Sequence, residues 1–122
     1  MSLVRPLFEG PLDVVGDVHG EIEALHALLG HLGYDEEGVH PRGRRLAFIG
    51  DLTDRGPDSV AVIDFVRRAC ERGRAQCVAG NHELNALRND PKHGNGWFFG
   101  RQERVSKEGP YYPSRLANAE EK

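Results

Sequence analysis

The stretch that decides the fold is residues 46–51, LAFIGD, in which four apolar residues lead directly into a glycine and an aspartate. A short apolar run of this kind, bounded by turn-forming residues, predicts a buried β-strand. Residues 12–17, LDVVGD, and residues 75–81, AQCVAGN, follow the same plan: a short apolar run, then a glycine, then a polar side chain. The sequence therefore predicts three strands, each followed at once by a residue that can carry chemistry.

The segments between these strands have the periodicity of helices. Apolar residues in the range 22–32 recur at the spacing of one helix face, and Gly33 is predicted to end that helix. Asp58 or Ser59 can cap a second helix, which is predicted to end at Gly73. The inner face of the second helix is expected to consist of Val60, Ile63, Val66, Ala69 and Cys70.

Strands that alternate with helices predict an α/β fold, because helical crossovers join parallel strands and are right-handed. We expect a three-layer architecture with a parallel β-α-β-α-β core over residues 12–88, within one partial domain that spans residues 1–122. Residues 89–122 lack clear periodicity and are expected to be irregular or poorly ordered. The strand residues predicted to be buried are Val14, Val15, Phe48, Ile49 and Val78.

The composition argues against several classes of protein. A net charge of −3 is unlike that of a general nucleic-acid or membrane-surface binder, which carries a strong basic excess. No segment approaches the ~18 apolar residues of a membrane span, and the N-terminus lacks the apolar core of a signal peptide. Cys70 and Cys77 form no CxxC pair, which is typical of core thiols in a reducing compartment. We therefore expect a cytoplasmic protein.

The polar residues that follow the three strands are predicted to meet in space. In an open parallel sheet the carboxyl ends of the strands lie along one edge, where ligands bind. The side chains expected to converge there are Asp17, His19, Asp51, Asp54, Asn81 and His82. Carboxylates, imidazoles and an amide oxygen form a mixed ligand set that suits Mn, Fe, Zn or Mg. Two such ions can activate a water molecule and stabilise an in-line displacement at phosphorus.

Three motifs at these positions resemble those of a known family. Residues 16–20 read GDVHG, residues 50–56 read GDLTDRG and residues 80–83 read GNHE. They resemble the GDxHG, GDxxDRG and GNHE motifs of the calcineurin-like metallophosphoesterases, and the DRG ending is similar to the phosphoprotein-phosphatase branch. One motif alone is a weak signal, whereas three in order are a strong one. The resemblance covers residues 13–87 and implies a metallophosphoesterase-like fold and a phosphatase activity.

The resemblance implies a metal centre. Asp17 and His19 would hold the first ion, Asp51 would bridge two ions, and Asn81 would hold the second. Two divalent ions are expected in the complete enzyme, manganese first, with Fe, Zn, Ni or Mg as alternatives. The family takes two further histidines and a second phosphate-binding arginine from its C-terminal half, whereas His93 alone follows the third motif here. We therefore expect this chain to correspond to the N-terminal half only and to hold at most one ion well.

The resemblance also implies which groups act on the substrate. His82 would be the general acid that protonates the leaving oxygen, with Asp54 orienting its ring. Arg55 would bind the phosphoryl oxygens, for which a planar bidentate donor is better suited than a lysine. Glu83 is expected to be a structural partner and not a metal ligand.

These expectations give one leading function and one alternative. The leading function is hydrolysis of a phosphate ester or anhydride by metal-activated water, with a phosphoprotein or a nucleotide as the substrate. Relatives of this kind include Ser/Thr protein phosphatases, symmetrical bis(5′-nucleosyl)-tetraphosphatases and the phosphatase domains of RNA-repair enzymes. The alternative is a non-catalytic metal-binding or phosphate-binding fragment or a scaffold, because the C-terminal ligands are absent. We expect this chain alone to show little activity and to self-associate through the uncovered edge of its core.

Overall fold

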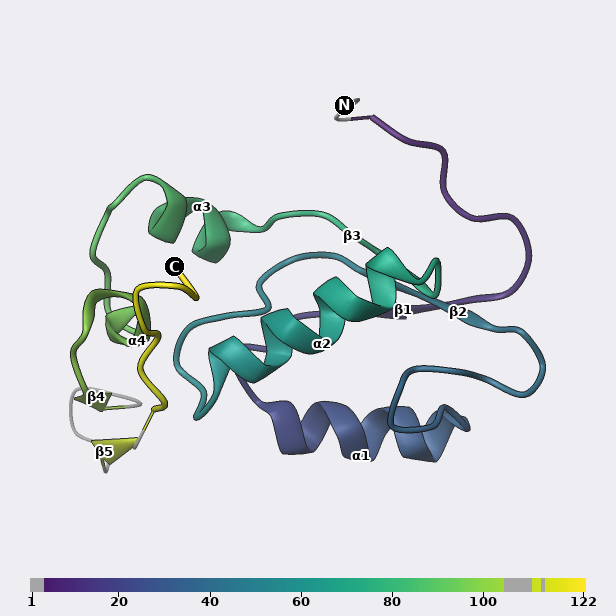
Figure 1. Cartoon of the computed structure of the whole chain (residues 1–122), viewed down its shortest axis with the longest axis horizontal. Helices are drawn as coiled ribbons and strands as arrows, with labels where there is room; N and C mark the ends of the chain where they lie inside the picture. Colours follow the sequence, from purple (N-terminus) through teal and green to yellow (C-terminus); the bar gives the residue numbers. More distant parts are fainter. Residues whose placement is uncertain (1–3, 105–110, 113) are drawn as a thin grey trace.

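The computed structural model describes residues 4–104, 111–112 and 114–122 of the chain (Figure 1). Its first part is a βαβαβ unit made of β1 (Leu12–Val15), α1 (Ile22–Leu32), β2 (Arg45–Phe48), α2 (Ser59–Glu71) and β3 (Ala75–Cys77). The elements that follow are α3 (Asn81–Leu87), α4 (Gly96–Phe99), β4 (Glu103–Arg104) and β5 (Tyr111–Tyr112). The expectation of irregular structure also falls on residues 105–110 and 113, which lie outside the described residues.

The strands β1, β2 and β3 form one parallel sheet in that order. The register places Val14 beside Ala47, and Phe48 beside Cys77. Because both right-handed crossovers run in the same direction across the sheet, α1 and α2 lie on the same face of it. The predicted α/β class with a parallel core is confirmed. No helix in the described part of the chain is long and apolar enough to span a membrane.

A single hydrophobic core fills the space between the two long helices and the sheet. Its side chains include Leu25, Leu29, Leu46, Phe48, Val62, Phe65, Val66 and Ala69. The inner face predicted for α2 is partly wrong, because Val60 and Ile63 are only half-buried. The side chain of Asp58 caps the helix by accepting a hydrogen bond from Ala61 N. The residues of the helix that meet the core include Val62 and Phe65 in place of Val60 and Ile63.

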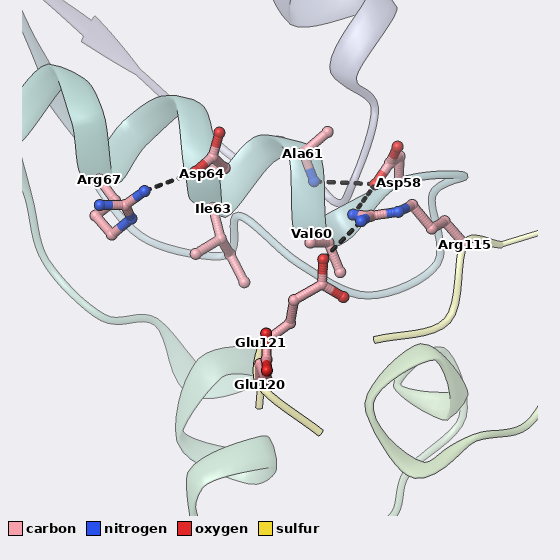
Figure 2. A pocket seen from close by; sticks show the side chains of 9 residues that line it. All are labelled: Asp58, Val60, Ala61, Ile63, Asp64, Arg67, Arg115, Glu120 and Glu121. Carbon is pink, nitrogen blue, oxygen red and sulfur yellow. Dashed lines mark hydrogen bonds and ion pairs between the residues drawn. The ribbon is translucent and has the colours of Figure 1, made fainter. Parts of the chain in front are cut away.

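Val60 and Ile63 line a hollow between α2 and the C-terminal segment (Figure 2). Arg115 closes one end of this hollow, where its guanidinium binds Glu121 at 2.6 Å and approaches Asp58 at 3.6 Å. The C-terminal segment therefore covers the part of α2 that the sequence pattern assigned to the core.

The opposite face of the sheet is open near the carboxyl ends of the strands. Val14, Ile49 and Val78 are 66%, 53% and 62% exposed, whereas Val15 and Phe48 are buried. The prediction that Val14, Ile49 and Val78 are buried is therefore wrong, and the prediction for Val15 and Phe48 is confirmed. Successive strand residues point to opposite faces, and the described helices α1 and α2 cover only one face. Self-association through the uncovered edge of the core stays a prediction.

The N-terminal segment crosses the other end of the open face. Phe8 N donates a hydrogen bond to Gln76 Oε1 at 2.9 Å, and Gln76 Nε2 donates to the carbonyl oxygen of Pro6 at 2.9 Å. The guanidinium of Arg45 lies 3.7 Å from the centre of the Phe8 ring, at cation–π distance. Of the three expected layers, the described residues thus form the helical layer and the sheet, with only this segment on the far side.

A polar cluster fixes the start of β1 against the end of α1. Asp13 accepts a hydrogen bond from the Tyr34 hydroxyl at 2.6 Å and two from Arg44 at 3.0 and 2.9 Å. The Arg44 guanidinium, and after it the Tyr34 hydroxyl, lowers the pKa of Asp13 below its usual value.

Asp13→Asn is expected to lower the free energy of unfolding by about 1–3 kcal/mol at pH 7, because it weakens charge-assisted hydrogen bonds. The folded-state pKa of Asp13 is depressed, so its contribution is full above the ordinary carboxyl value of about 4 and is lost as the pH falls through the folded-state pKa. Urea unfolding of both proteins at a series of pH values measures this difference. A difference that stayed constant down to strongly acidic pH would contradict the assignment.

Candidate metal centre and active site

The three motif loops meet at the carboxyl edge of the sheet. Val18 N and His19 N both donate hydrogen bonds to the carbonyl oxygen of Asp51 at 3.0 Å, and Gly20 N donates to that of Leu52 at 2.8 Å. These bonds join the loop after β1 to the loop after β2. The structure therefore brings together residues that are more than thirty positions apart in the sequence.

Two glycines permit the close approach of these loops. A Cβ atom at Gly56 would collide with the carbonyl oxygen of His19, and one at Gly80 would collide with the carboxylate of Asp51. Neither glycine has a positive φ, so space and not backbone conformation requires glycine at both positions.

Glu83 ties the loop after β2 to the loop after β3. Its Oε2 atom accepts hydrogen bonds from Leu52 N at 3.1 Å, from Thr53 N at 3.3 Å and from Thr53 Oγ1 at 2.9 Å. Its Oε1 atom accepts a bond from Gly80 N at 3.1 Å. Both carboxylate oxygens are thus engaged with the protein, as expected for a structural partner.

Backbone strain is concentrated in the same loops. The described non-glycine residues with positive φ are His19, Asp51, Asp54, Arg55 and Asn89, and all but the last belong to the motifs. Such conformations cost about 1–3 kcal/mol each and persist where the surrounding structure fixes them, often at functional sites. The hydrogen bonds between the loops supply that fixation here.

Asp17 and His19 form a pair that suits a cation. His19 Nδ1 lies 2.8 Å from the carbonyl oxygen of Thr53, which can only accept, so Nδ1 carries the proton. Nε2 then has a lone pair, and it faces Asp17 Oδ2 at a distance of 3.5 Å. Two acceptors that face one another need a cation or a proton between them. A backbone carbonyl on the other ring nitrogen is also the usual support of a metal-binding histidine.

The remaining predicted ligands lie beside this pair but are not gathered around one point. Asp51 Oδ1 accepts a hydrogen bond from His82 N at 3.2 Å, and Asn81 is exposed at the first position of α3. Among the described residues, no three His, Cys, Asp or Glu side chains form a group that could hold an ion. The donor types and the Asp17–His19 pair fit a divalent ion, whereas the third ligand is not in place.

The second histidine of the site has a different partner. His82 Nδ1 donates to Asp54 Oδ2 at 2.8 Å, and Asp54 is fully buried at 0% exposure. This bond leaves His82 Nε2 to face outward, and the rings of His82 and His19 are 4.7 Å apart and nearly perpendicular. A histidine held by a buried carboxylate can serve as a general acid.

Arg55 lies at the rim of the site. Its backbone N donates to the carbonyl oxygen of Gly94 at 2.8 Å, and the residue is exposed. His93, which directly precedes Gly94, is also exposed. The side chain of Arg55 can therefore meet a substrate from solvent.

The residue that the sequence did not reveal as part of the site is Trp97. Its Nε1 atom donates a hydrogen bond to Asp54 Oδ1 at 2.7 Å across 43 positions of sequence. The tryptophan lies in an apolar run, WFF at 97–99, which by itself indicates only burial. No periodicity or spacing links it to the second motif, so the contact required the structure.

Gly56→Ala is expected to lower the free energy of unfolding by about 1–3 kcal/mol, because the added methyl group collides with the backbone at His19. The matched control is Gly16→Ala in the first motif, where a Cβ atom would meet nothing within 4 Å. The control is expected to change stability by less than about 0.5 kcal/mol. Urea unfolding of the three proteins is the measurement, and equal effects at the two glycines would refute the close-packing argument.

Comparison with known proteins agrees with the motifs. The chain matches the calcineurin-like phosphoesterase family over residues 10–119. A relative from Geobacillus thermodenitrificans is 47% identical over 74 residues, which are 58% of this chain and 30% of the relative. Relatives from Bacillus subtilis and Halalkalibacterium halodurans are 48% and 49% identical over 73 residues, which are 57% of this chain and 30% of each relative.

These three relatives are named bis(5′-nucleosyl)-tetraphosphatase PrpE [asymmetrical]. The aligned part of this chain spans 30% of their length. The family match, in contrast, covers nearly the whole of the chain. The chain therefore belongs to the calcineurin-like phosphoesterase family.

Proposed function

We propose that this chain supplies the centre of a metal-dependent phosphoesterase that hydrolyses a phosphate ester or anhydride. The observation that carries the proposal is the pairing of two histidines with different partners, 4.7 Å apart. His19 presents a lone pair toward Asp17, as a metal ligand does, and His82 is held by the buried Asp54, as a general acid is. A metal-binding or phosphate-binding scaffold has use for the first arrangement but not for the second, so the catalytic function is favoured.

The proposed ligands are Asp17, His19, Asp51 and Asn81, a set of oxygen and nitrogen donors. Such a set suits Mn, which we expect first, and also Fe, Zn, Ni or Mg. Divalent ions, when bound, would supply Lewis-acid activation of water and compensation of negative charge at phosphorus. The preformed Asp17–His19 pair supports one such site in this chain.

Three residues of the chain would act on the substrate or support a residue that does. His82 would donate the proton on Nε2 to the leaving oxygen, while its Nδ1–H bond to Asp54 keeps the ring oriented. The carboxylate of Asp54 would stabilise the positive charge that the ring carries before it gives up the proton. Arg55 would bind the non-bridging phosphoryl oxygens from the rim of the site.

A dinucleoside tetraphosphate is the substrate that we propose first. The support is the name shared by the relatives, bis(5′-nucleosyl)-tetraphosphatase, together with their identity of 47–49% over the aligned segment. A phosphoprotein is the alternative substrate class. Both free cysteines in the described structure, Cys70 and Cys77, support a reducing, cytoplasmic location as part of the proposal.

The metal site can be tested on this chain alone. We expect dialysis against Mn²⁺ followed by elemental analysis to find about one ion per chain, because one ligand pair is preformed. His19→Ala should abolish this binding, whereas His93→Ala, an exposed histidine outside the pair, should leave it intact. Binding that survives His19→Ala would refute the assignment, and two tightly held ions would refute the expectation of a single site.

The role of His82 can be tested through the leaving group. In the complete enzyme, His82→Ala is expected to lower turnover of a dinucleoside tetraphosphate or an alkyl phosphate by about 10²–10⁴-fold, the usual contribution of a general acid. The loss should be much smaller for p-nitrophenyl phosphate, whose leaving group hardly needs a proton, and metal content should be unchanged. Steady-state assays with Mn²⁺ compare the substrates, and equal losses on all of them would speak against the acid.

A further inference from the structure

Asp54 is held from two sides, and the function proposed above uses only one of them. Its Oδ2 atom accepts from His82 Nδ1 at 2.8 Å, and its Oδ1 atom accepts from Trp97 Nε1 at 2.7 Å. Asp54 is 0% exposed and Trp97 is 4% exposed, so the bond between them is shielded from water, whereas the His82 side chain is 15% exposed. The indole thus occupies the acceptor of Asp54 that His82 does not use.

The segment that carries Trp97 is itself fixed in place. The fully buried Asn95 accepts a hydrogen bond from Lys92 N at 2.8 Å and donates one to the carbonyl oxygen of Asp90 at 3.0 Å. Ala117 N donates to the carbonyl oxygen of Trp97 at 2.8 Å, which ties the C-terminal segment to α4. The indole N–H is therefore aimed at Asp54 by a framework that does not include His82.

The donor and the acceptor of the hydrogen bond between Trp97 and Asp54 cannot be exchanged. An indole N–H can only donate, so Oδ1 must remain an acceptor and cannot carry a proton toward Trp97. A carboxylate with one oxygen fixed in this way cannot rotate freely, and its second oxygen keeps its aim at His82 Nδ1. Loss of the indole N–H would leave Oδ1 buried without this donor, which a carboxylate relieves by rotating or by admitting water.

We propose that Trp97 is a positioning residue for His82, acting through Asp54. The catalytic part of this inference rests on the proposed function, whereas the structural part concerns the orientation and tautomer of the His82 ring in this chain. The expected consequence of losing the indole N–H is an imidazole that no longer keeps its proton on Nδ1. A general acid with a mobile ring protonates the leaving group less often.

The contact can be observed directly, because Trp97 is the only tryptophan in the chain. A ¹H–¹⁵N spectrum therefore contains one indole N–H signal. Asp54→Asn is expected to move this signal upfield and to speed its exchange with solvent, since a neutral amide replaces the charged acceptor. An indole signal that is unaffected by Asp54→Asn would overturn the proposal, whether or not the variants of Trp97 itself fold.

The effect on His82 is tested with Trp97→Phe, which keeps an aromatic ring but removes the donor. The ¹⁵N signals of the His82 ring, at a pH where the ring is neutral, are expected to change from the Nδ1–H tautomer toward a mixture. The matched control is Phe98→Leu, which removes the ring packed edge-on against Trp97 at 5.6 Å but leaves the indole N–H. An unchanged tautomer in Trp97→Phe, or the same change in the control, would overturn the proposal.

Kinetics separate this inference from the function on which it rests. In the complete enzyme, Trp97→Phe should lower turnover of an alkyl phosphate by about tenfold or more, a part of the 10²–10⁴-fold that a general acid contributes. Turnover of p-nitrophenyl phosphate should fall by less than about threefold. Equal losses on both substrates would indicate general damage and refute positioning. A complete wild-type enzyme without turnover on any substrate would refute the proposed function, while the tautomer measurement on this chain would still decide the role of Trp97.

Discussion

The buried carboxylate of Asp54 is the constraint on which the arrangement of the site depends. A charged group without access to water costs several kcal/mol unless hydrogen bonds and ion pairs satisfy it. Its side chain binds His82 of α3 and Trp97 of α4, and its backbone N donates to Ser59 Oγ at the start of α2 at 3.0 Å. Two segments that are remote in sequence, together with the nearby start of α2, are thereby held at fixed positions around one residue.

The site is held together by its backbone as much as by its side chains. His19 and Asp51 have φ values of 49° and 51°, a conformation that non-glycine residues seldom adopt. The loops tolerate it because Asp51 accepts two backbone hydrogen bonds from the first loop and because Glu83 anchors the second loop to the third. Glu83 thus holds the peptide units on which the proposed ligands lie.

The sequence predicts the strands, the long helices and the convergence of the motif loops well, because each depends on local patterns. It fails for the open face of the sheet. LAFI is apolar on both faces, a pattern typical of a sheet covered on both sides, and Val14 belongs to the apolar face of LDVV, yet Val14 and Ile49 are exposed. The sequence also does not predict the contact between Trp97 and Asp54, because a hydrogen bond between residues 54 and 97 does not affect the spacing or the periodicity of residues along the chain.

The two histidines of the site show how the partner of one ring nitrogen sets the chemistry of the other. Both rings are bound through Nδ1, so both present Nε2 to the site. His19 is bound by the neutral carbonyl of Thr53, which fixes the ring and leaves Nε2 a lone-pair donor suited to an ion. His82 is bound by the charged carboxylate of Asp54, which stabilises an imidazolium and so suits a proton donor. The same tautomer would therefore serve the two proposed roles, and the charge of the partner would separate them.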